Sequence, residues 1–443
     1  MIAPTTGKAF AVLFEDLKRW SVNSFFTTQW KWPSDLIKPL TSGLERKSVA
    51  IEKMRIDPKD ITLVSLHFDG EMEPREDSIA GFKGRLFLAE PGDVIYSKID
   101  VRHGAIGVVS DTLPRIAVSS EFPVYRVRSE VALPRYVKLL FQTDAFRRQI
   151  NALISGTSGR KRVQPSDLEE VEVPLPHPDI QRTIVDFWHE AITAVESAQQ
   201  KLAQPVNALN VRLLELYRRE SSRDVIHSRF FALDFKDLAA WDVKSGRASA
   251  FRLTCPSFRP LGDFIEEATD LVRPFDKPEK NWPVYGVNNK EGVFLNGHQK
   301  GKSFKAAYKR IRKDWFFHNP TRCNVGSLGI VPDVHGDAIT SPEYQVWRVK
   351  EDARSPILPG FLAVLIQTSF FIDLIQFNRV GAVKQRMYTE NLCQLRIPYL
   401  PESEQRTYAQ AREEALADLT SARDRLAQAR KEVEDMILGI KKV

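Results

Sequence analysis

Residues 180–219 decide the fold, and they read IQRTIVDFWHEAITAVESAQQKLAQPVNALNVRLLELYRR. Apolar residues recur there at alternating steps of four and three, with one longer step, at Trp188, Ile192, Val195, Leu202, Val206, Leu209, Leu213 and Leu216. This spacing is a heptad seam along one face of a long helix, with a polar position at Gln199. Such a helix is about 60 Å long at about 1.5 Å per residue, and Pro205 is expected to bend it or break one turn.

A second heptad seam lies near the C-terminus, at Ala415, Leu419, Ala422, Leu426, Ala429, Val433, Met436 and Ile440. One alanine per heptad lets two helix backbones approach closely, and the larger side chains of the first seam would fill the space opposite. We therefore expect the two helices to form an antiparallel coiled coil within the chain. Packing of each helix on its own globule, or dimerisation through the seam, is the alternative.

The composition is that of a protein with two or three domains. The 443 residues carry a net charge of +7 and a pI of about 9.1, which permits an acidic partner such as nucleic acid. The cysteines Cys255, Cys323 and Cys393 lie far apart, so neither a disulfide framework nor a zinc site is expected. The N-terminus lacks a signal pattern and the apolar stretch 361–372 is too short to span a bilayer, so we expect a cytoplasmic location.

The chain contains an internal repeat at an offset of 221 to 225 residues. The matching pairs, in order, are FEDLKRWSVNS (14–24) with FKDLAAWDVKS (235–245), GAIGVV (104–109) with GSLGIV (326–331), YRV (125–127) with WRV (347–349), LPRYVKLLFQT (133–143) with LPGFLAVLIQT (358–368), and QR (181–182) with QR (405–406). Five ordered matches at nearly constant offset indicate a duplication. Residues 25–90 and 246–312 share almost nothing, so we expect a repeated frame that carries unrelated inserts.

Each half is predicted to be a globule followed by a long helix. Short β-rich runs joined by Gly and Pro turns precede a helix that Leu-Pro opens at 133 and at 358, and a glycine-containing basic loop follows. We therefore predict an α/β (α+β) fold with mixed or antiparallel sheets and a pseudo-two-fold repeat. The expected division is 1–178 for the first globule, 179–222 for the central helix, 223–401 for a polar linker and the second globule, and 402–443 for the distal helix.

This order of segments resembles the specificity (S) subunit of type I restriction-modification systems. The motifs that carry the resemblance are GDVIYSKI (92–99), GAIGVV, Leu-Pro-x-aromatic before Gln142-Thr143, and the basic loop before Pro174-Leu-Pro and Gln181-Arg182. The resemblance implies two target recognition domains that read a bipartite, asymmetric double-stranded DNA sequence. It also implies a scaffold for methyltransferase (M) subunits, and in the full complex for restriction (R) subunits, with S-adenosylmethionine, ATP and Mg bound by those partners.

Three groups of basic residues are candidate DNA contacts. The basic loop contributes Arg160, Lys161 and Arg162, with Arg379, Lys384 and Arg386 as counterparts, while the Gly104 and Gly326 turns are preceded by Lys98, Arg102, His103 and Arg322. The densest run is Lys300, Lys302, Lys305, Lys309, Arg310 and Arg312. Asn288, Asn289, Asn296 and Gln299 are candidates for reading adenine edges. The alternatives are a solvated surface, M-subunit contact or turn chemistry; for Gln181-Arg182 and Gln405-Arg406 they are M-subunit contact or local packing.

Motifs for catalysis are missing from the sequence. Asn319-Pro320-Thr321 departs from the amino-methyltransferase motif at its third position, and no phosphate-binding Gly-x4-Gly-Lys-Ser/Thr occurs. We therefore predict no catalytic residue, no metal ligand and no enzyme activity in this chain. The functional alternatives are an S-like subunit of a type IIB-like system and a bivalent adaptor without a DNA role.

Overall fold

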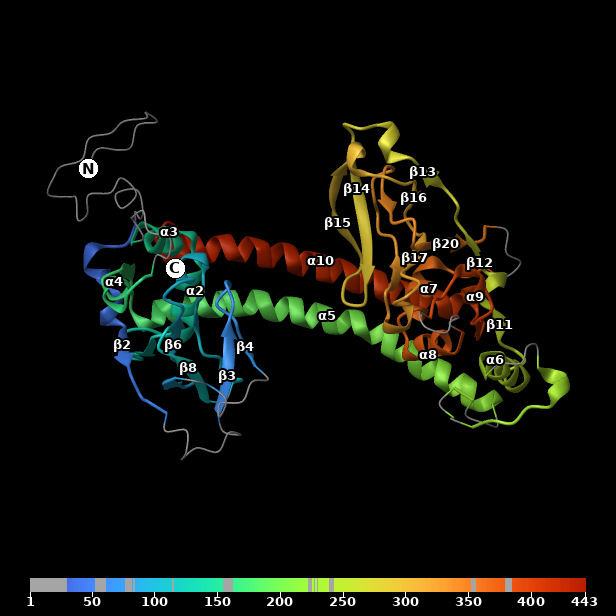
Figure 1. Cartoon of the computed structure of the whole chain (residues 1–443), viewed down its shortest axis with the longest axis horizontal. Coiled ribbons are helices and arrows are strands. Elements are labelled where there is room, and N and C mark those ends of the chain that lie inside the picture. The colour runs from blue at the N-terminus through green and yellow to red at the C-terminus, as the bar shows by residue number, and fades with distance from the viewer. Residues whose placement is uncertain are drawn as a thin grey trace. The chain divides into compact units, whose positions relative to one another are not determined.

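The computed structural model describes residues 30–51, 61–75, 82, 84–113, 115–153, 162–221, 225–226, 228, 230–238, 243–351, 356–378 and 385–443. The chain divides into two compact units, Met1–Ala194 with Arg423–Val443, and Val195–Ala422. Each unit holds one globule and part of each of two long helices, α5 (Pro178–Glu220) and α10 (Glu402–Leu438) (Figure 1). The predicted mixed fold with two long helices is confirmed.

Each unit contains a four-stranded antiparallel sheet, of which three strands lie outside the divergent ranges 25–90 and 246–312 and one edge strand lies within them. In the first unit the order is β2 (Leu44–Lys47), β9 (Val124–Val127), β6 (Val94–Tyr96), β7 (Ile106–Val108). In the second unit it is β12 (Ile265–Glu267), β20 (Gln345–Val349), β17 (Phe316–His318), β18 (Leu328–Ile330). The two sheets match strand for strand, so we call this sheet the frame sheet of each unit.

A second sheet in each unit is built mainly from the divergent inserts. The orders are β4 (Met72–Pro74), β3 (Ile61–Leu66), β8 (Arg115–Ser119), β5 (Leu86–Ala89), and β15 (Gly292–Lys300), β14 (Asn281–Asn288), β19 (Ile339–Thr340), β16 (Tyr308–Arg310), β13 (Leu271–Val272). Both contain a hairpin, β3–β4 or β14–β15, whose first strand pairs in parallel with β8 or β19. The prediction of unrelated inserts is therefore wrong for their topology. Sheet hydrogen bonds join backbone groups, so a strand order can persist after the side chains have diverged.

Short helices and two-stranded pairs complete both units, and all but α6 of the helices have a described counterpart in the other unit. The strand pairs are β1 (Ile37–Pro39) with β10 (Glu172–Pro174) and β11 (Arg259–Pro260) with β21 (Arg396–Ile397). The helices are α2 (Pro134–Gln142), α3 (Asp144–Leu153), α4 (Pro165–Glu169), α6 (Val243–Thr254), α7 (Pro359–Leu365), α8 (Ser369–Asn378) and α9 (Thr389–Cys393). The 3-10 turns are η2 (Ser34–Leu36), η3 (Leu40–Ser42), η5 (Val101–His103), η6 (Phe235–Asp237), η7 (Leu261–Asp263), η8 (Pro274–Asp276), η9 (Gly301–Ser303) and η10 (Cys323–Val325). Pro134 and Pro359 start α2 and α7 as predicted.

The long helices are part of the core of each unit. In the first unit, Val433 and Ile437 of α10 share a buried cluster with Ile184 of α5 and the β-sheet aromatics. In the second unit, Leu209 and Leu213 of α5 lie in the cluster of α6, α7 and α8. Tyr408 and Ala409 of α10 pack against the same cluster, so each globule depends on both long helices for its core.

The two long helices run antiparallel in the second unit. Lys201 pairs with Asp418 at 3.0 Å, and Arg212 pairs with Glu404 at 2.9 Å, so residue numbers rise along α5 as they fall along α10. The predicted antiparallel packing is confirmed there.

Each long helix also caps a helix of one globule. The side-chain oxygen of Glu434 accepts the backbone N–H of Asp144 at 2.9 Å at the start of α3. In the second unit, Asn210 Oδ1 accepts the N–H of Phe370 at 3.0 Å at the start of α8. Because the first N–H groups of a helix have no partner within it, these bonds join each globule to a long helix.

The predicted seams are right in most positions and wrong at two, Gln199 and Ile440. In α10 the alanines and Val433 are buried as expected, but the helix ends at Leu438 and Ile440 is 60% exposed. In α5, Gln199 is exposed and the neighbouring Ala198 is buried in its place. Pro205 is buried and α5 is helical throughout, so no turn is broken there, while a bend at Pro205 stays a prediction. One lost backbone hydrogen bond is offset where the surrounding turns of the helix are packed in a core.

The segment after α5 is not only a polar linker. Val225 and Ile226 are buried in the second core, and Tyr217 Oη accepts the Val225 N–H at 2.7 Å. The expectation failed because two apolar residues in a basic stretch carry too weak a pattern to predict burial.

His318 is a fully buried neutral histidine on β17 of the second unit. Its Nδ1 accepts the Trp347 Nε1–H at 3.1 Å, and its Nε2–H donates to the Met387 carbonyl at 2.9 Å. Burial lowers the pKa of His318 to about 4. Because Nδ1 is already an acceptor, protonation would remove the Trp347 bond.

The second unit should therefore lose stability as the pH falls from about 6.5 towards 4. Over that window the unfolded histidine binds a proton that the folded one does not, at about 1.4 kcal/mol per pH unit. Hydrogen exchange of β17 and β20 amides measures this free energy of opening at several pH values. His318→Gln should be less stable at pH 7 but show a flatter pH dependence, whereas an unchanged slope would contradict the assignment.

Candidate nucleic-acid interface

The repeated Gly-x-x-Gly motif begins at a tight turn in both units. η5 ends at Gly104 with φ +102°, and η10 ends at Gly326 with φ +86°. This left-handed backbone favours glycine because it lacks a Cβ. The turn exposes Arg102 and His103 in the first unit and Arg322 in the second.

The tip of the insert hairpin rests on these glycines. A Cβ at Gly104 would lie well inside 3.0 Å of the Phe68 carbonyl oxygen, and one at Gly107 equally close to that of Gly70. In the second unit, a Cβ at Gly326 would lie 3.4 Å from Asn289 Cβ, and one at Gly329 3.2 Å from the Val293 nitrogen. We call the two glycines of each motif the hairpin seat, since the divergent hairpin meets the repeated frame there.

The basic loop is tied to the same turn. Val163 N–H donates to the Lys98 carbonyl at 2.9 Å, and Met387 N–H donates to the equivalent Pro320 carbonyl at 2.9 Å. Arg162 directly precedes Val163 and Arg386 directly precedes Met387. The two bonds therefore place these arginines beside the η5 and η10 segments. We call this region the turn–loop junction of each unit. Arg160, Lys161, Arg379 and Lys384 lie outside the described residues.

The structure thus brings two predicted groups together in each unit: Lys98, Arg102, His103 and Arg162 in the first, and Arg322 and Arg386 in the second. Lys98 Nζ donates to the Ser120 carbonyl at 2.7 Å, and Arg162 contacts Glu121 at 3.3 Å. Arg386 is half-buried on its loop, with Nη1 3.4 Å from Tyr388 Oη. Exposed or half-buried guanidinium and ammonium groups at these positions can still reach phosphates.

Sequence reasoning did not identify Phe68 or Lys290 at the hairpin tips. Phe68 is 59% exposed, and its ring centroid lies 5.6 Å from that of His103. Lys290 is exposed where β14 turns into β15, beside Asn288, whose Oδ1 accepts the Lys290 and Glu291 N–H groups. The hairpins are distant in sequence from the turns they contact, so no local pattern could have joined them.

The basic run of the second unit lies away from the hairpin seat. Lys300 pairs with Asn281 at the end of the hairpin opposite its Asn288–Gly292 tip, about 25 Å of strand away. Lys300 and Lys302 contact Glu279 at 3.2 and 3.5 Å. Lys305 is exposed and can approach an external anion.

The later residues of this basic run are bonded to groups within the second unit. Arg312 pairs with Asp270 at 2.6 Å, and Arg310 donates to the Gly336 carbonyl at 2.6 Å. The Lys309 side chain is only 14% exposed, and burial lowers its pKa. The run is therefore not one continuous basic surface, and DNA contact by its members stays a prediction. Asn296 and Gln299 are exposed on β15.

Other kinds of site have little support in the described ranges. Among them, no group of three or more His, Cys, Asp and Glu side chains is placed to hold a metal ion. No single helix there is long and apolar enough to cross a membrane, although α7 and α8 pass by length and composition as a pair bent by 72°.

Comparison with known proteins returned matches among solved structures. No protein-family model matches the sequence, and no curated protein does. The HsdS subunit from Thermoanaerobacter tengcongensis is 14% identical, with a TM-score of 0.32 and 91% of this chain and 94% of that chain covered. The type I restriction-modification S subunit from M. genitalium is 13% identical, with a TM-score of 0.43 and coverage of 92% and 97%.

A third match comes from a structure of the type I restriction-modification system that addresses its complex assembly and conformational transition. It is 14% identical, with a TM-score of 0.38 and coverage of 91% and 95%. The resemblance is to type I restriction-modification S subunits.

Proposed function

We propose that this chain is the DNA sequence-recognition subunit of a type I restriction-modification complex. The observation that carries the proposal is that one frame occurs twice, and each copy holds a different hairpin on the same glycine seat beside basic residues. A reader of two unlike half-sites needs this combination. The contacts that position the protein are then shared, while the contacts that specify bases differ.

The turn–loop junction and the hairpin of each unit would make different kinds of contact. Lys98 and Arg162 in the first unit, and Arg322 and Arg386 in the second, would hold phosphates and set the register on the duplex. The hairpins would carry the readout, because a two-stranded ribbon fits the major groove. Phe68 in one tip and Asn289 and Lys290 in the other offer different chemistry to the base edges.

Catalysis would belong to the partners. Residues 1–178 and 223–401 would be the target recognition domains, and residues 179–222 and 402–443 the spacer helices that scaffold the methyltransferase (M) subunits. S-adenosylmethionine, ATP and Mg would be used by the M and restriction (R) subunits in the cytoplasm. An S-like subunit of a type IIB-like system would read DNA in the same way and differ in its nuclease partner.

The hairpin assignment is tested by exchanging residues 288–291, the tip of β14–β15, for the tip of another S subunit. The variant is co-expressed with its cognate M subunit, and the methylated sites are mapped across the host genome. One half of the split target should change while the other stays, because the first unit is untouched. If both halves stay the same, the second hairpin does not read bases.

Arg162→Gln and Arg386→Gln should each weaken DNA binding about tenfold on all sequences alike, because a charge-assisted phosphate contact is lost. Each should also lower the slope of log affinity against log salt by about one between about 50 and 200 mM salt. The measurement is a DNA titration of the complex with its M subunit. Arg135→Gln is the control, since this exposed arginine lies on α2 and belongs to neither turn–loop junction. Binding that ignores salt would favour a bivalent adaptor without a DNA role.

A further inference from the structure

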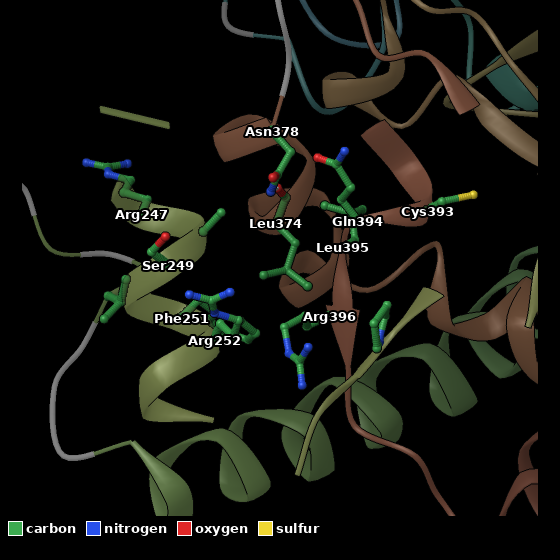
Figure 2. Close-up of a pocket in the computed structure, with 13 residues that line it drawn as sticks. Arg247, Ser249, Phe251, Arg252, Leu374, Asn378, Cys393, Gln394, Leu395 and Arg396 are labelled. Atoms are coloured by element: carbon green, nitrogen blue, oxygen red, sulfur yellow. The ribbon is translucent and has the colours of Figure 1, made fainter. Parts of the chain in front are cut away.

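A cavity of about 370 Å³ lies in the second unit between α6, the end of α8 and β21 (Figure 2). Its charged lining residues are Arg247, Arg252 and Arg396, and no Asp or Glu lines it in the described part of the chain. Phe251, Leu374 and Leu395 provide an apolar side. Arg247 is engaged at the edge, where it donates to the Ser228 carbonyl at 3.2 Å.

Among the described residues, neither Arg252 nor Arg396 has a carboxylate partner in an ion pair. Arg396 Nε is buried and has no hydrogen-bond partner within the described ranges, while its Nη2 donates to the Pro256 carbonyl at 3.3 Å. Burial and the charge of Arg252 together lower the pKa of Arg396. The charge of Asp263 raises the pKa of Arg396, but Asp263 is already paired with Arg259 at 3.1 Å.

Two guanidinium groups that repel each other at a cavity are stabilised when an anion lies between them. Arginine presents a planar fork of N–H donors that matches phosphate oxygens. Arg252 from α6 and Arg396 from β21 both line this cavity (Figure 2). The apolar side formed by Phe251 and Leu374 would suit an organic body rather than a bare ion, and the volume lies in the range of small-molecule sites.

We propose that this cavity binds an organic phosphate, with the phosphate group between Arg252 and Arg396 and the organic body against Phe251 and Leu374. The site does not depend on the proposed DNA function. The phosphate can belong to a free small molecule or to a nucleic-acid backbone, and the experiment separates these sources.

The test is calorimetric titration of the full chain with adenosine 5′-monophosphate, inorganic phosphate and adenosine. The two phosphates should bind and adenosine should not. Arg252→Gln and Arg396→Gln should each reduce the affinity for adenosine monophosphate at least tenfold. Arg273→Gln, which removes an arginine paired with Asp276 elsewhere in the unit, should leave it unchanged. No binding of either phosphate, or equal binding by all variants, would overturn the proposal.

Two further arms complete the design. Arg252 is exposed, so Arg252→Gln should fold even if Arg396→Gln does not, and Arg396→Lys should regain part of the affinity. A short DNA duplex whose affinity falls in Arg252→Gln as that of adenosine monophosphate does identifies a backbone phosphate as the source. Unchanged duplex affinity, with adenosine monophosphate binding lost, identifies a free organic phosphate.

Discussion

Replacing Gly107 by alanine is expected to displace the β3–β4 hairpin from its seat in the first unit. The new Cβ would lie well inside 3.0 Å of the Gly70 carbonyl oxygen, a backbone atom that cannot rotate away as a side chain does. Separating the two segments should cost about 3 kcal/mol of stability, at the upper end of overpacking penalties. Urea unfolding gives this free energy, and faster hydrogen exchange of the His67 amide, which donates to Glu71, would report hairpin opening.

Two other glycines serve as matched controls for this prediction. Gly329→Ala introduces a milder contact of 3.2 Å with Val293 and should cost about 1 kcal/mol. At Gly336 a Cβ would have no neighbouring atom within 4 Å, so Gly336→Ala should be nearly neutral. Equal stability of Gly107→Ala and Gly336→Ala would refute the seat. If the proposed function holds, Gly107→Ala should also impair reading of one half-site and spare the other.

Replacing Gln181 or Gln405 by alanine should have the second large effect. Gln181 Oε1 accepts the Leu133 N–H at 2.8 Å, and Nε2 donates to the Val131 and Pro176 carbonyls. Gln405 makes the equivalent bond to Leu358 N–H at 2.9 Å. Both side chains are fully buried. Each substitution leaves several backbone groups unpaired in the core, which should cost about 3 kcal/mol or more in denaturant unfolding.

The arginines that follow these glutamines are the matched controls. Arg182 and Arg406 are exposed and pair with Asp179 and Glu402 on their own helices. Alanine at either arginine should change stability by less than about 0.5 kcal/mol. Of the two interpretations that the repeated Gln-Arg pair left open, local packing therefore accounts for the glutamines. A Gln181→Ala chain as stable as the Arg182→Ala chain would be incompatible with this role.

The features that could be predicted from the sequence are those set by neighbours along the chain. A heptad seam, a proline at the first turn of a helix and a repeat with constant offset are patterns within one segment. α5 and α10 lie close to their expected bounds for this reason, as do α2 and α7. The basic loop and the turn residues could also be recognised as candidates, because each of them occurs in both halves of the duplicated sequence.

Contacts between distant segments could not be predicted in this way. Phe68 and Gly104 meet across 36 positions of chain, and only the folded backbone brings the hairpin onto the seat. The basic run of the second unit looked continuous in sequence, yet its strands and turns point Lys309 inward and Arg312 to Asp270. The face of the sheet to which a side chain points depends on the pairing register of its strand, and the sequence alone did not show that register.

The sequence by itself determined the duplication, the two long helices and the helix starts, because short-range periodicity and steric preferences specify them. Only the tertiary structure decided that both inserts share one strand order, that Pro205 is buried in an unbroken helix, and that Gly-x-x-Gly is a seat for a hairpin. The physical reason is that these features arise from backbone pairing and close packing between residues far apart in the chain. Such contacts leave little trace in local composition.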